Sequence, residues 1–183
     1  MKKILLFALA VMFMASAKAQ EYRFPGVDKS PADILLYPLR VANDTTKTAS
    51  IRVVYSRPSK NGRVIFGELE KFGAVWRMGA NEQTEITFFK PVTIGGKSIQ
   101  PGTYSMFAIP EQNEWTIILN KQNNRWGAYT YKQNLDVVRV KVPVKAAPQP
   151  IEVFSMMFRD APNGALLIAG WDNTIVELPI TIN

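Results

Sequence analysis

The chain has 183 residues, with 22 Lys and Arg against 15 Asp and Glu, and it contains no His and no Cys. It therefore lacks the usual ligands of zinc, copper, haem iron and iron–sulfur clusters, and it cannot form a disulfide. Cysteine nucleophiles and the Ser-His-Asp triad are excluded too, so we expect no metal and no cofactor. Any catalysis would have to use Asp, Glu, Lys, Tyr, Ser or Arg.

Residues 1–19 have the pattern of a secretory signal peptide. Met-Lys-Lys is followed by an apolar stretch from Ile4 to Ala15 and by Ser16-Ala17-Lys18-Ala19, a small-x-small end. The apolar stretch is too short to span a bilayer, which needs about 20 residues. The sequence therefore predicts cleavage after Ala19 and export of the remaining chain.

Residues 20–183 are predicted to form a single domain, because a chain of about 150 residues buries enough surface for one core. Removing the signal peptide removes three Lys and no acid, so the net charge falls from +7 to +4. This mild charge, without a run of basic residues, does not predict nucleic-acid binding. No later segment is apolar enough to suggest a transmembrane helix.

The periodicity after residue 31 is that of β-strands. Ile51, Val53 and Tyr55 alternate with Arg52, Val54 and Ser56, which predicts a strand with one buried face. By the same reasoning, together with β-branched and aromatic content, further strands are predicted at 84–89, 92–94, 97–99, 103–109, 115–119, 137–142, 151–158, 165–171 and 174–182.

Turn residues separate these strands. Gly95-Gly96 favours a tight hairpin turn, because both residues can adopt positive φ. The Pro-rich segment 144–150 predicts a stiff connector that crosses between sheets. Short strands with turns between them predict an all-β fold, an antiparallel β-sandwich of the jelly-roll or Ig-like kind.

Residues 55–84 form the stretch in which chemistry is most concentrated. The candidate ligand-binding residues in it are Arg57, Arg63, Trp76, Arg77, Asn81 and Glu82. Guanidinium groups near aromatic rings can bind a carboxylate, phosphate or sulfate, whereas a Trp ring with polar neighbours can bind a sugar. The alternative is structural: each Arg pairs with an acid or a backbone carbonyl, and Trp76 lies in the core. The residues alone leave both interpretations open, and they name no catalytic residue.

Two further features bear on function. Trp126, beside Asn124, Arg125 and Gly127, is predicted to lie in a loop and is a secondary candidate for ligand binding. Glu82 and Glu85 are three residues apart, so they would lie on opposite faces if that stretch is extended. The dispersed acids are therefore interpreted as solvated turn residues.

The motifs of this chain resemble those of a secreted bacterial family known as domain of unknown function 2911. The resemblance is carried by Tyr55-Ser56-Arg57-Pro58-Ser59, Gly62-Arg63, Ile65-Phe66-Gly67, Trp76-Arg77, Gly79-Ala80-Asn81-Glu82, Thr84, Gly102-Thr103-Tyr104-Ser105, Trp115 to Asn120, Trp126-Gly127-Ala128-Tyr129, Asp136-Val137 and Arg139-Val140. It implies an exported protein of Gram-negative bacteria, in the periplasm or outside the cell, with no assigned activity and no catalytic residues. Met78 departs from the pattern, in which a small residue such as Thr is expected.

Three hypotheses about function follow. The first is a non-enzymatic binding module for a small polar or anionic ligand or a glycan, held by the residues of the 55–84 stretch. The second is an envelope structural or interaction protein that docks a partner protein through edge strands. The third is a hydrolase that uses two carboxylates.

Overall fold

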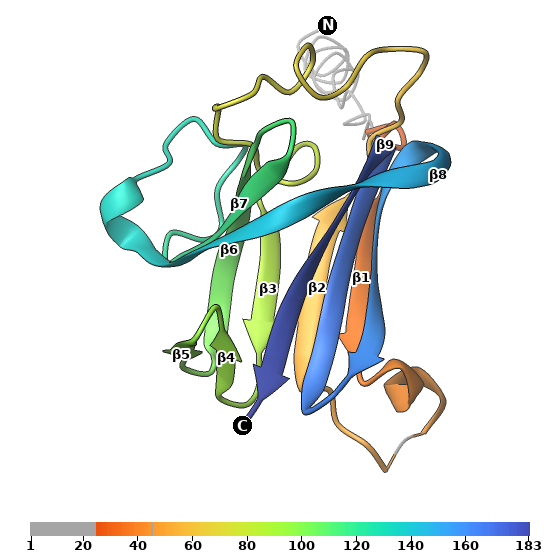
Figure 1. The fold of residues 1–183 in the computed structure, drawn as a ribbon. Coiled ribbons are helices and arrows are strands. Elements are labelled where there is room, and N and C mark those ends of the chain that lie inside the picture. Colours follow the sequence, from red (N-terminus) through yellow and green to blue (C-terminus); the bar gives the residue numbers. More distant parts are fainter. Residues whose placement is uncertain (1–24, 45) are drawn as a thin grey trace, which may run out of the picture.

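The structure of the chain is a computed structural model, which describes residues 25–44 and 46–183 (Figure 1). The predicted signal peptide lies outside the described residues and stays a prediction. No helix in the described residues is long and apolar enough to cross a membrane.

The described residues form an all-β structure in which every strand pairing is antiparallel, as the sequence predicts. The strands are β1 (Ala32–Tyr37), β2 (Ile51–Ser56), β3 (Thr84–Phe88), β4 (Val92–Ile94), β5 (Lys97–Ile99), β6 (Gly102–Pro110), β7 (Glu114–Asn120), β8 (Asp136–Ala161) and β9 (Gly164–Ile182). Two short 3-10 helices, η1 (Leu39–Asn43) and η2 (Gln133–Leu135), lie in loops.

The strands follow the order β1-β2-β3-β6-β7-β8-β9-β4-β5, and β8 is shared between the two layers of the molecule. Residues 136–143 of β8 pair with β7, whereas its pairing with β9 runs from Val144 to Ala161. Register shifts interrupt that second pairing between Ala146 and Ile151 and again before Ser155. Because such irregularities bend a strand, β8 passes from one layer to the other across the top of the molecule (Figure 1).

The Pro-rich segment 144–150 crosses between the sheets as predicted, but it belongs to β8 and is not a separate connector. Pro148 and Pro150 lie in the interval where the ladder to β9 is interrupted. Proline lacks the N–H that a ladder requires, so this interval is where a long strand accommodates it.

Several local predictions are confirmed. The β4–β5 hairpin turns at Gly95 and Gly96, both of which have positive φ. Ile51, Val53 and Tyr55 all lie in the core. Strand β1 was not among the predicted strands. The strands predicted at 165–171 and 174–182 form one strand, β9, which bends at Asp172, where φ is 52°.

The core lies between the two layers and is rich in aromatic side chains. Trp76, at its centre, has its ring centroid 5.7 Å from that of Trp115, 5.9 Å from that of Trp171 and 5.0 Å from that of Phe154. Such pairs contribute about 0.5–1.5 kcal/mol each beyond the burial of apolar area. In a chain without disulfides, this packing carries the cohesion of the fold.

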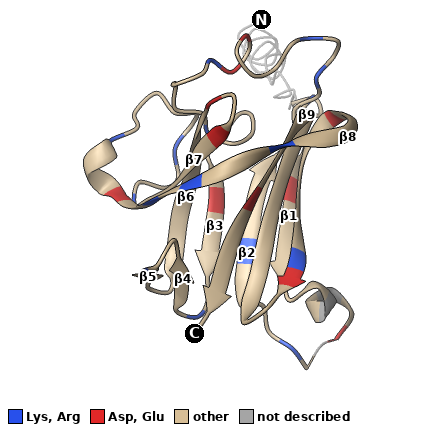
Figure 2. Cartoon of the chain, in the orientation of Figure 1, with Lys and Arg blue, Asp and Glu red and all other residues tan. Residues whose placement is uncertain are grey.

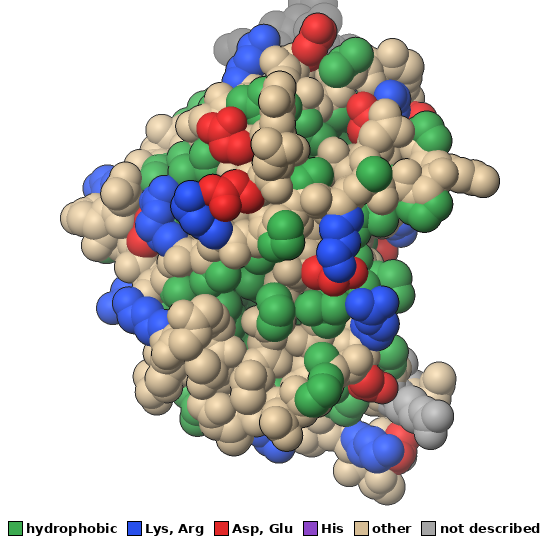
Figure 3. Space-filling model, in the orientation of Figure 1, with side chains coloured by type: hydrophobic (Ala, Val, Ile, Leu, Met, Phe, Trp, Pro, Cys, Tyr) green, Lys and Arg blue, Asp and Glu red, His purple; other side chains and the backbone are tan. Residues whose placement is uncertain are grey.

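Charges of both signs are distributed over the strands and loops (Figure 2). On the face drawn in Figure 3, basic and acidic side chains lie next to one another, with hydrophobic side chains between them. Glu177 on β9 shows the pattern, since it pairs with Lys145 at 2.6 Å and with Arg159 at 3.5 Å. This face therefore carries no large patch of one sign.

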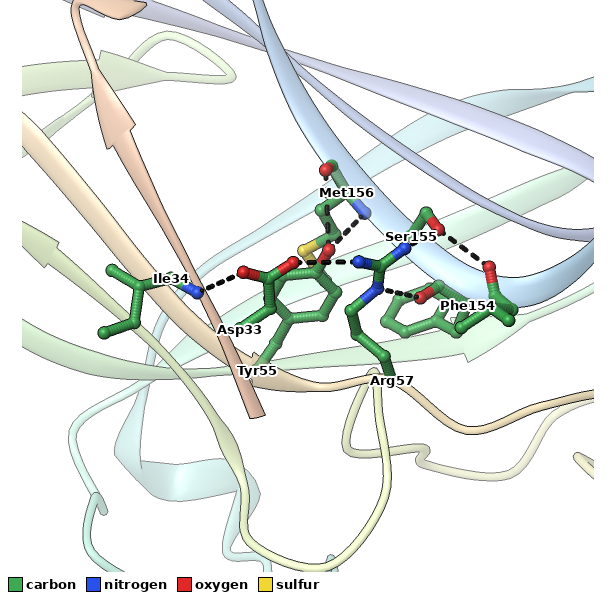
Figure 4. Close-up of polar contacts among 8 residues, drawn as sticks. Asp33, Ile34, Tyr55, Arg57, Phe154, Ser155 and Met156 are labelled. Carbon is green, nitrogen blue, oxygen red and sulfur yellow. Dashed lines mark hydrogen bonds and ion pairs between the residues drawn. The ribbon is translucent and has the colours of Figure 1, made fainter. Parts of the chain in front are cut away.

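A buried hydroxyl joins the two layers near their open edges. The Tyr55 hydroxyl on β2 accepts a hydrogen bond from the backbone N–H of Met156 on β8 at 2.9 Å (Figure 4). It also lies 3.5 Å from the Met156 carbonyl oxygen, to which it can donate. Burial raises the pKa of Tyr55, so the hydroxyl keeps its proton at neutral pH.

Replacing Tyr55 by Phe should leave the Met156 N–H buried without a partner. We expect the Tyr55→Phe variant to lose about 1–3 kcal/mol of unfolding free energy, measured by urea denaturation. Tyr104→Phe is the matched control, because the Tyr104 hydroxyl bonds the Gln100 carbonyl at 2.9 Å in an exposed position. Equal losses in the two variants would contradict the role assigned to Tyr55.

Candidate ligand-binding groove

Arg57 directly follows β2, and its side chain binds other residues of the protein. Its guanidinium donates to the Asp33 carboxylate at 3.0 Å, to the Ser155 hydroxyl at 2.8 Å and to the Phe154 carbonyl at 3.3 Å (Figure 4). These partners belong to β1 and β8, on either side of the gap between the two layers. Arg57 therefore links the layers beside Tyr55, and it is not a lining residue of the groove described below.

Arg63 stabilises the loop between β2 and β3, called here the β2–β3 loop (residues 57–83). Its side chain donates to the Lys60 carbonyl at 2.9 Å and to the Ser59 carbonyl at 2.6 Å. The same loop is held against β9 by an ion pair of 2.6 Å between Lys60 and Asp172. Arg63 thus satisfies carbonyls of its own turn.

Trp76 is a core residue, with 2% of its surface exposed. Its backbone N–H and carbonyl both bond Ala108 on β6 at 2.8 Å, and its indole N–H donates to the Gly79 carbonyl at 3.1 Å. These bonds draw the β2–β3 loop into the molecule. The Trp76 ring consequently offers no surface to a ligand.

Arg77 lies near Glu70 of the same loop, without a direct ion pair between them among the described residues. The Arg77 Nε atom is buried and has no hydrogen-bond partner in the described part of the chain. Burial raises the pKa of Glu70 to about 7, although the positive charges of Arg77 and Arg63 oppose the shift. Glu70 is thus a half-buried acid whose protonation changes near neutral pH.

The remaining two candidates of the 55–84 stretch, Asn81 and Glu82, lie beside a groove on the outer face of β1, β2 and β3. The groove has a cavity volume of about 510 Å³. Its lining residues are Ala32, Val54, Tyr55, Ser56, Glu82, Gln83, Glu85, Asn124, Arg125 and Trp126. It therefore contains Glu82 and Trp126, whereas Arg57, Arg63, Trp76, Arg77 and Asn81 do not line it.

One wall of the groove is the loop between β7 and β8, called here the covering loop (residues 121–135). Its backbone pairs with the start of β3: the Gly127 N–H donates to the Asn81 carbonyl at 2.9 Å, and the Gln83 N–H donates to the Arg125 carbonyl at 3.0 Å. This pairing places Trp126 directly opposite Glu82. Asn81, at a φ of 58°, provides the bend before the pairing.

The covering loop is fixed at its other end by a charged cluster. The Asp136 carboxylate accepts hydrogen bonds from the Tyr131 hydroxyl at 2.6 Å, from Arg139 at 2.8 Å and from Asn120 at 2.7 Å. Burial and the bond to Asp136 raise the pKa of Tyr131 to about 12. The Tyr131 ring also packs on Phe107 of β6, with 5.2 Å between centroids. The wall of the groove is thus held in place before any ligand arrives.

The floor of the groove carries polar groups with unused hydrogen-bonding capacity. Gln83 is 4% exposed, and its amide oxygen accepts a hydrogen bond from the Ser105 hydroxyl at 2.7 Å. Its amide nitrogen has no partner among the described residues. Glu85 accepts the Asn124 backbone N–H at 3.0 Å through one carboxylate oxygen. The free carboxylate oxygen of half-buried Glu85 can accept a hydrogen bond from a ligand hydroxyl or from water, whereas the Gln83 amide nitrogen is buried beneath the groove surface.

Two aromatic side chains of the covering loop are exposed beside the groove. Trp126 is 58% exposed and lines it, and Tyr129, three residues further on, is 84% exposed. Gly127 lies between them at a φ of 63°, and a Cβ atom there would lie 2.6 Å from the Tyr129 ring. The turn therefore requires glycine both for its backbone conformation and for the close approach of this ring.

Glu82 and Glu85 line the same groove, although the sequence predicts opposite faces for them. The prediction assumes an extended strand from residue 82 to residue 85, but β3 begins only at Thr84, so the alternation of faces does not hold across Glu82 and Gln83. In the described residues, no group of three or more acids is placed to hold a metal ion. The groove combines an aromatic ring, two carboxylates, one guanidinium and amide groups.

Removing the Arg57 guanidinium should loosen the junction of the two layers. We expect Arg57→Met to lower the unfolding free energy by about 1–2 kcal/mol, since its partners are only half-buried. The matched control is Arg52→Met, because Arg52 is exposed on β2, the strand that Arg57 follows. Urea denaturation measures both variants, and an equal effect of the two would contradict a linking role for Arg57.

Glu70 should make the stability depend on pH. Its pKa is 4.5 in an unfolded chain and about 7 in the fold, so the fold loses stability as the pH rises between these values. We expect Glu70→Gln to be more stable than the parent by about 3 kcal/mol at about pH 8 and equal to it at about pH 4. Glu68→Gln, an exposed neighbour in the same loop, is the control. A difference that does not change with pH would refute the prediction.

Comparisons with known proteins agree with the resemblance seen in the sequence. The family described as "Protein of unknown function (DUF2911)" matches residues 37–180, which is most of the chain. The match includes the β2–β3 loop, the covering loop and nearly every residue of the groove. No curated protein and no solved structure matches the chain. The chain belongs to the family of proteins of unknown function called DUF2911.

Proposed function

We propose that this protein is an exported, non-enzymatic module that binds a glycan in the groove between the covering loop and strands β1 to β3. The observation that carries the proposal is the half-exposed ring of Trp126 in the wall of a preformed groove. Export rests on the signal-peptide pattern of residues 1–19, and it places the groove outside the cytoplasm, where glycans of the cell envelope are found.

The composition of the groove suits a sugar. A sugar ring has apolar C–H faces that pack against an indole, and its hydroxyls form hydrogen bonds with amide and carboxylate groups. Trp126 supplies the apolar surface, whereas Glu82 and Glu85 supply polar groups in the same groove. Tyr129, exposed three residues further along the covering loop, offers a second aromatic ring but does not line the groove.

An anionic ligand, the other possibility raised by the sequence, has less support. Arg57 and Arg63 use their guanidinium groups on protein atoms. Among the residues that line the groove, Arg125 is the one base, against two acids, Glu82 and Glu85. The groove therefore favours a neutral or positively charged ligand over a phosphate or sulfate.

A second candidate function is glycoside hydrolysis, because Glu82 and Glu85 both line the groove and the reaction needs two carboxylates. The test is to incubate the protein with oligosaccharides that it binds and to measure newly formed reducing ends. Release that Glu82→Gln and Glu85→Gln both abolish would support hydrolysis, whereas intact oligosaccharides would support the binding module.

The binding proposal predicts that Trp126→Ala loses glycan binding without losing stability. We expect affinity for oligomers of glucose, N-acetylglucosamine, mannose or xylose to fall by about tenfold or more, as for the loss of one aromatic anchor. The melting temperature should stay within about 2 °C of the parent, because the ring is largely exposed. Isothermal titration calorimetry and thermal unfolding measure the two quantities.

Phe89→Ala is the matched control for Trp126→Ala. Phe89 is 52% exposed, follows the far end of β3 and does not line the groove. It should keep the affinity of the parent. Equal losses of affinity in the two variants, or no binding of any of these oligosaccharides by the parent protein, would refute the glycan proposal.

A further inference from the structure

The groove is lined by two acidic residues and one basic residue. Glu82 and Glu85 both line it, and neither forms an ion pair with any of the described residues. Some acids elsewhere, such as Glu114 and Glu177, do have cationic partners, whereas others, such as Glu68 and Glu111, have none among the described residues. What distinguishes Glu82 and Glu85 is that both line one groove. The carboxylates of the groove are thus available to a positive group of a ligand.

The position of Glu85 strengthens this point. It is half-buried in the middle of the sheet, where its cross-strand neighbours are Val54 on β2 and Ser105 on β6, both uncharged. One carboxylate oxygen accepts the Asn124 N–H, and the other has no partner among the described residues. A half-buried carboxylate with an unused oxygen attracts a cation more strongly than a fully solvated one.

The indole ring of Trp126 also attracts positively charged groups. This exposed ring stands opposite Glu82 across the short backbone pairing between residues 81–83 and 125–127. The face of an indole ring is the best aromatic partner for an ammonium group. An aromatic ring and two carboxylates around one groove recognise a protonated amine.

We propose that the groove selects glycans that carry a protonated amino group, with the amine bound between Glu82, Glu85 and the ring of Trp126. The ligand class is an amino sugar with a free amine, such as a glucosamine unit. This inference rests on the proposed glycan-binding function. It takes the binding of a sugar as given and adds that the sugar carries a positive charge. Arg125 also lines the groove, and its positive charge is expected to lower the affinity for a positively charged ligand.

The test compares three oligosaccharides of equal length by calorimetry at about pH 6, where an amine of this class is protonated. They are the trimers of glucosamine, N-acetylglucosamine and glucose. The glucosamine trimer should bind about tenfold more tightly than the other two, and this advantage should shrink as salt is added, because the attraction is electrostatic.

Variants then locate the effect. Glu85→Gln keeps an acceptor for the Asn124 N–H but removes the charge, so affinity for the glucosamine trimer should fall by about tenfold and affinity for the glucose trimer much less. Arg125→Gln should raise the affinity for the glucosamine trimer. Glu68→Gln changes the net charge equally but lies outside the groove, and it should bind as the parent does.

The outcomes separate this inference from the function on which it rests. Equal affinity of the parent for all three trimers, with no effect of Glu85→Gln, would overturn the selection of amines and leave the glycan function intact. Binding of the glucosamine trimer that Glu68→Gln weakens as much as Glu85→Gln would show a general charge effect and would also overturn it. If none of the trimers binds, both proposals are wrong.

Discussion

The contacts of Trp76 with Trp115, Trp171 and Phe154 are the interaction on which the rest of the structure depends. Trp76 belongs to the β2–β3 loop, Trp115 to β7, and Phe154 and Trp171 to the hairpin of β8 and β9. The cluster therefore joins both layers and the longest loop. A chain without cysteine has no covalent alternative, and packing of this kind is what keeps its layers together.

The inward position of Trp76 decides where a ligand can bind. Because the β2–β3 loop is drawn into the core at Trp76, its arginines turn back onto protein atoms: Arg57 onto β1 and β8, and Arg63 onto carbonyls of its own loop. The open polar surface lies on the outer face of β2 and β3, where the covering loop stands beside the sheet. Closure of the core and placement of the groove are two results of the same arrangement.

The sequence predicts the fold more completely than the site, for a physical reason. Alternation along Ile51, Val53 and Tyr55 and the Gly95-Gly96 turn are local signals, and both are confirmed in the structure. Strand β8 continues through its prolines because its pairing with β9 is interrupted where Pro148 and Pro150 lie. The number of prolines in the sequence does not reveal where such an interruption occurs. Strand β1, at the edge of its sheet, has an irregular apolar pattern and was missed.

The candidate site was harder to predict because it is made by contacts between distant segments. Glu82 and Trp126 were both named from the sequence, but their backbone pairing joins residues that are far apart along the chain. Gln83 and Glu85 lacked any motif, and only the position of the covering loop over β3 distinguishes them from other polar residues on the sheet. The role of the six residues first named in ligand binding stays a prediction. Of these six, Glu82 lines the groove, and so does the secondary candidate Trp126.

The way in which the groove is held has a consequence for its chemistry. Its wall is fixed by backbone hydrogen bonds between residues 81–83 and 125–127 and by the buried Asp136 cluster, not by the side chains that face the groove. Glu82, Arg125 and Trp126 are exposed and have no hydrogen bonds through their side chains to other described residues. Changes at these positions therefore alter the charge and shape offered to a ligand at little cost in stability. The DUF2911 fold in this chain thus separates the residues that maintain the groove from those that determine what it binds.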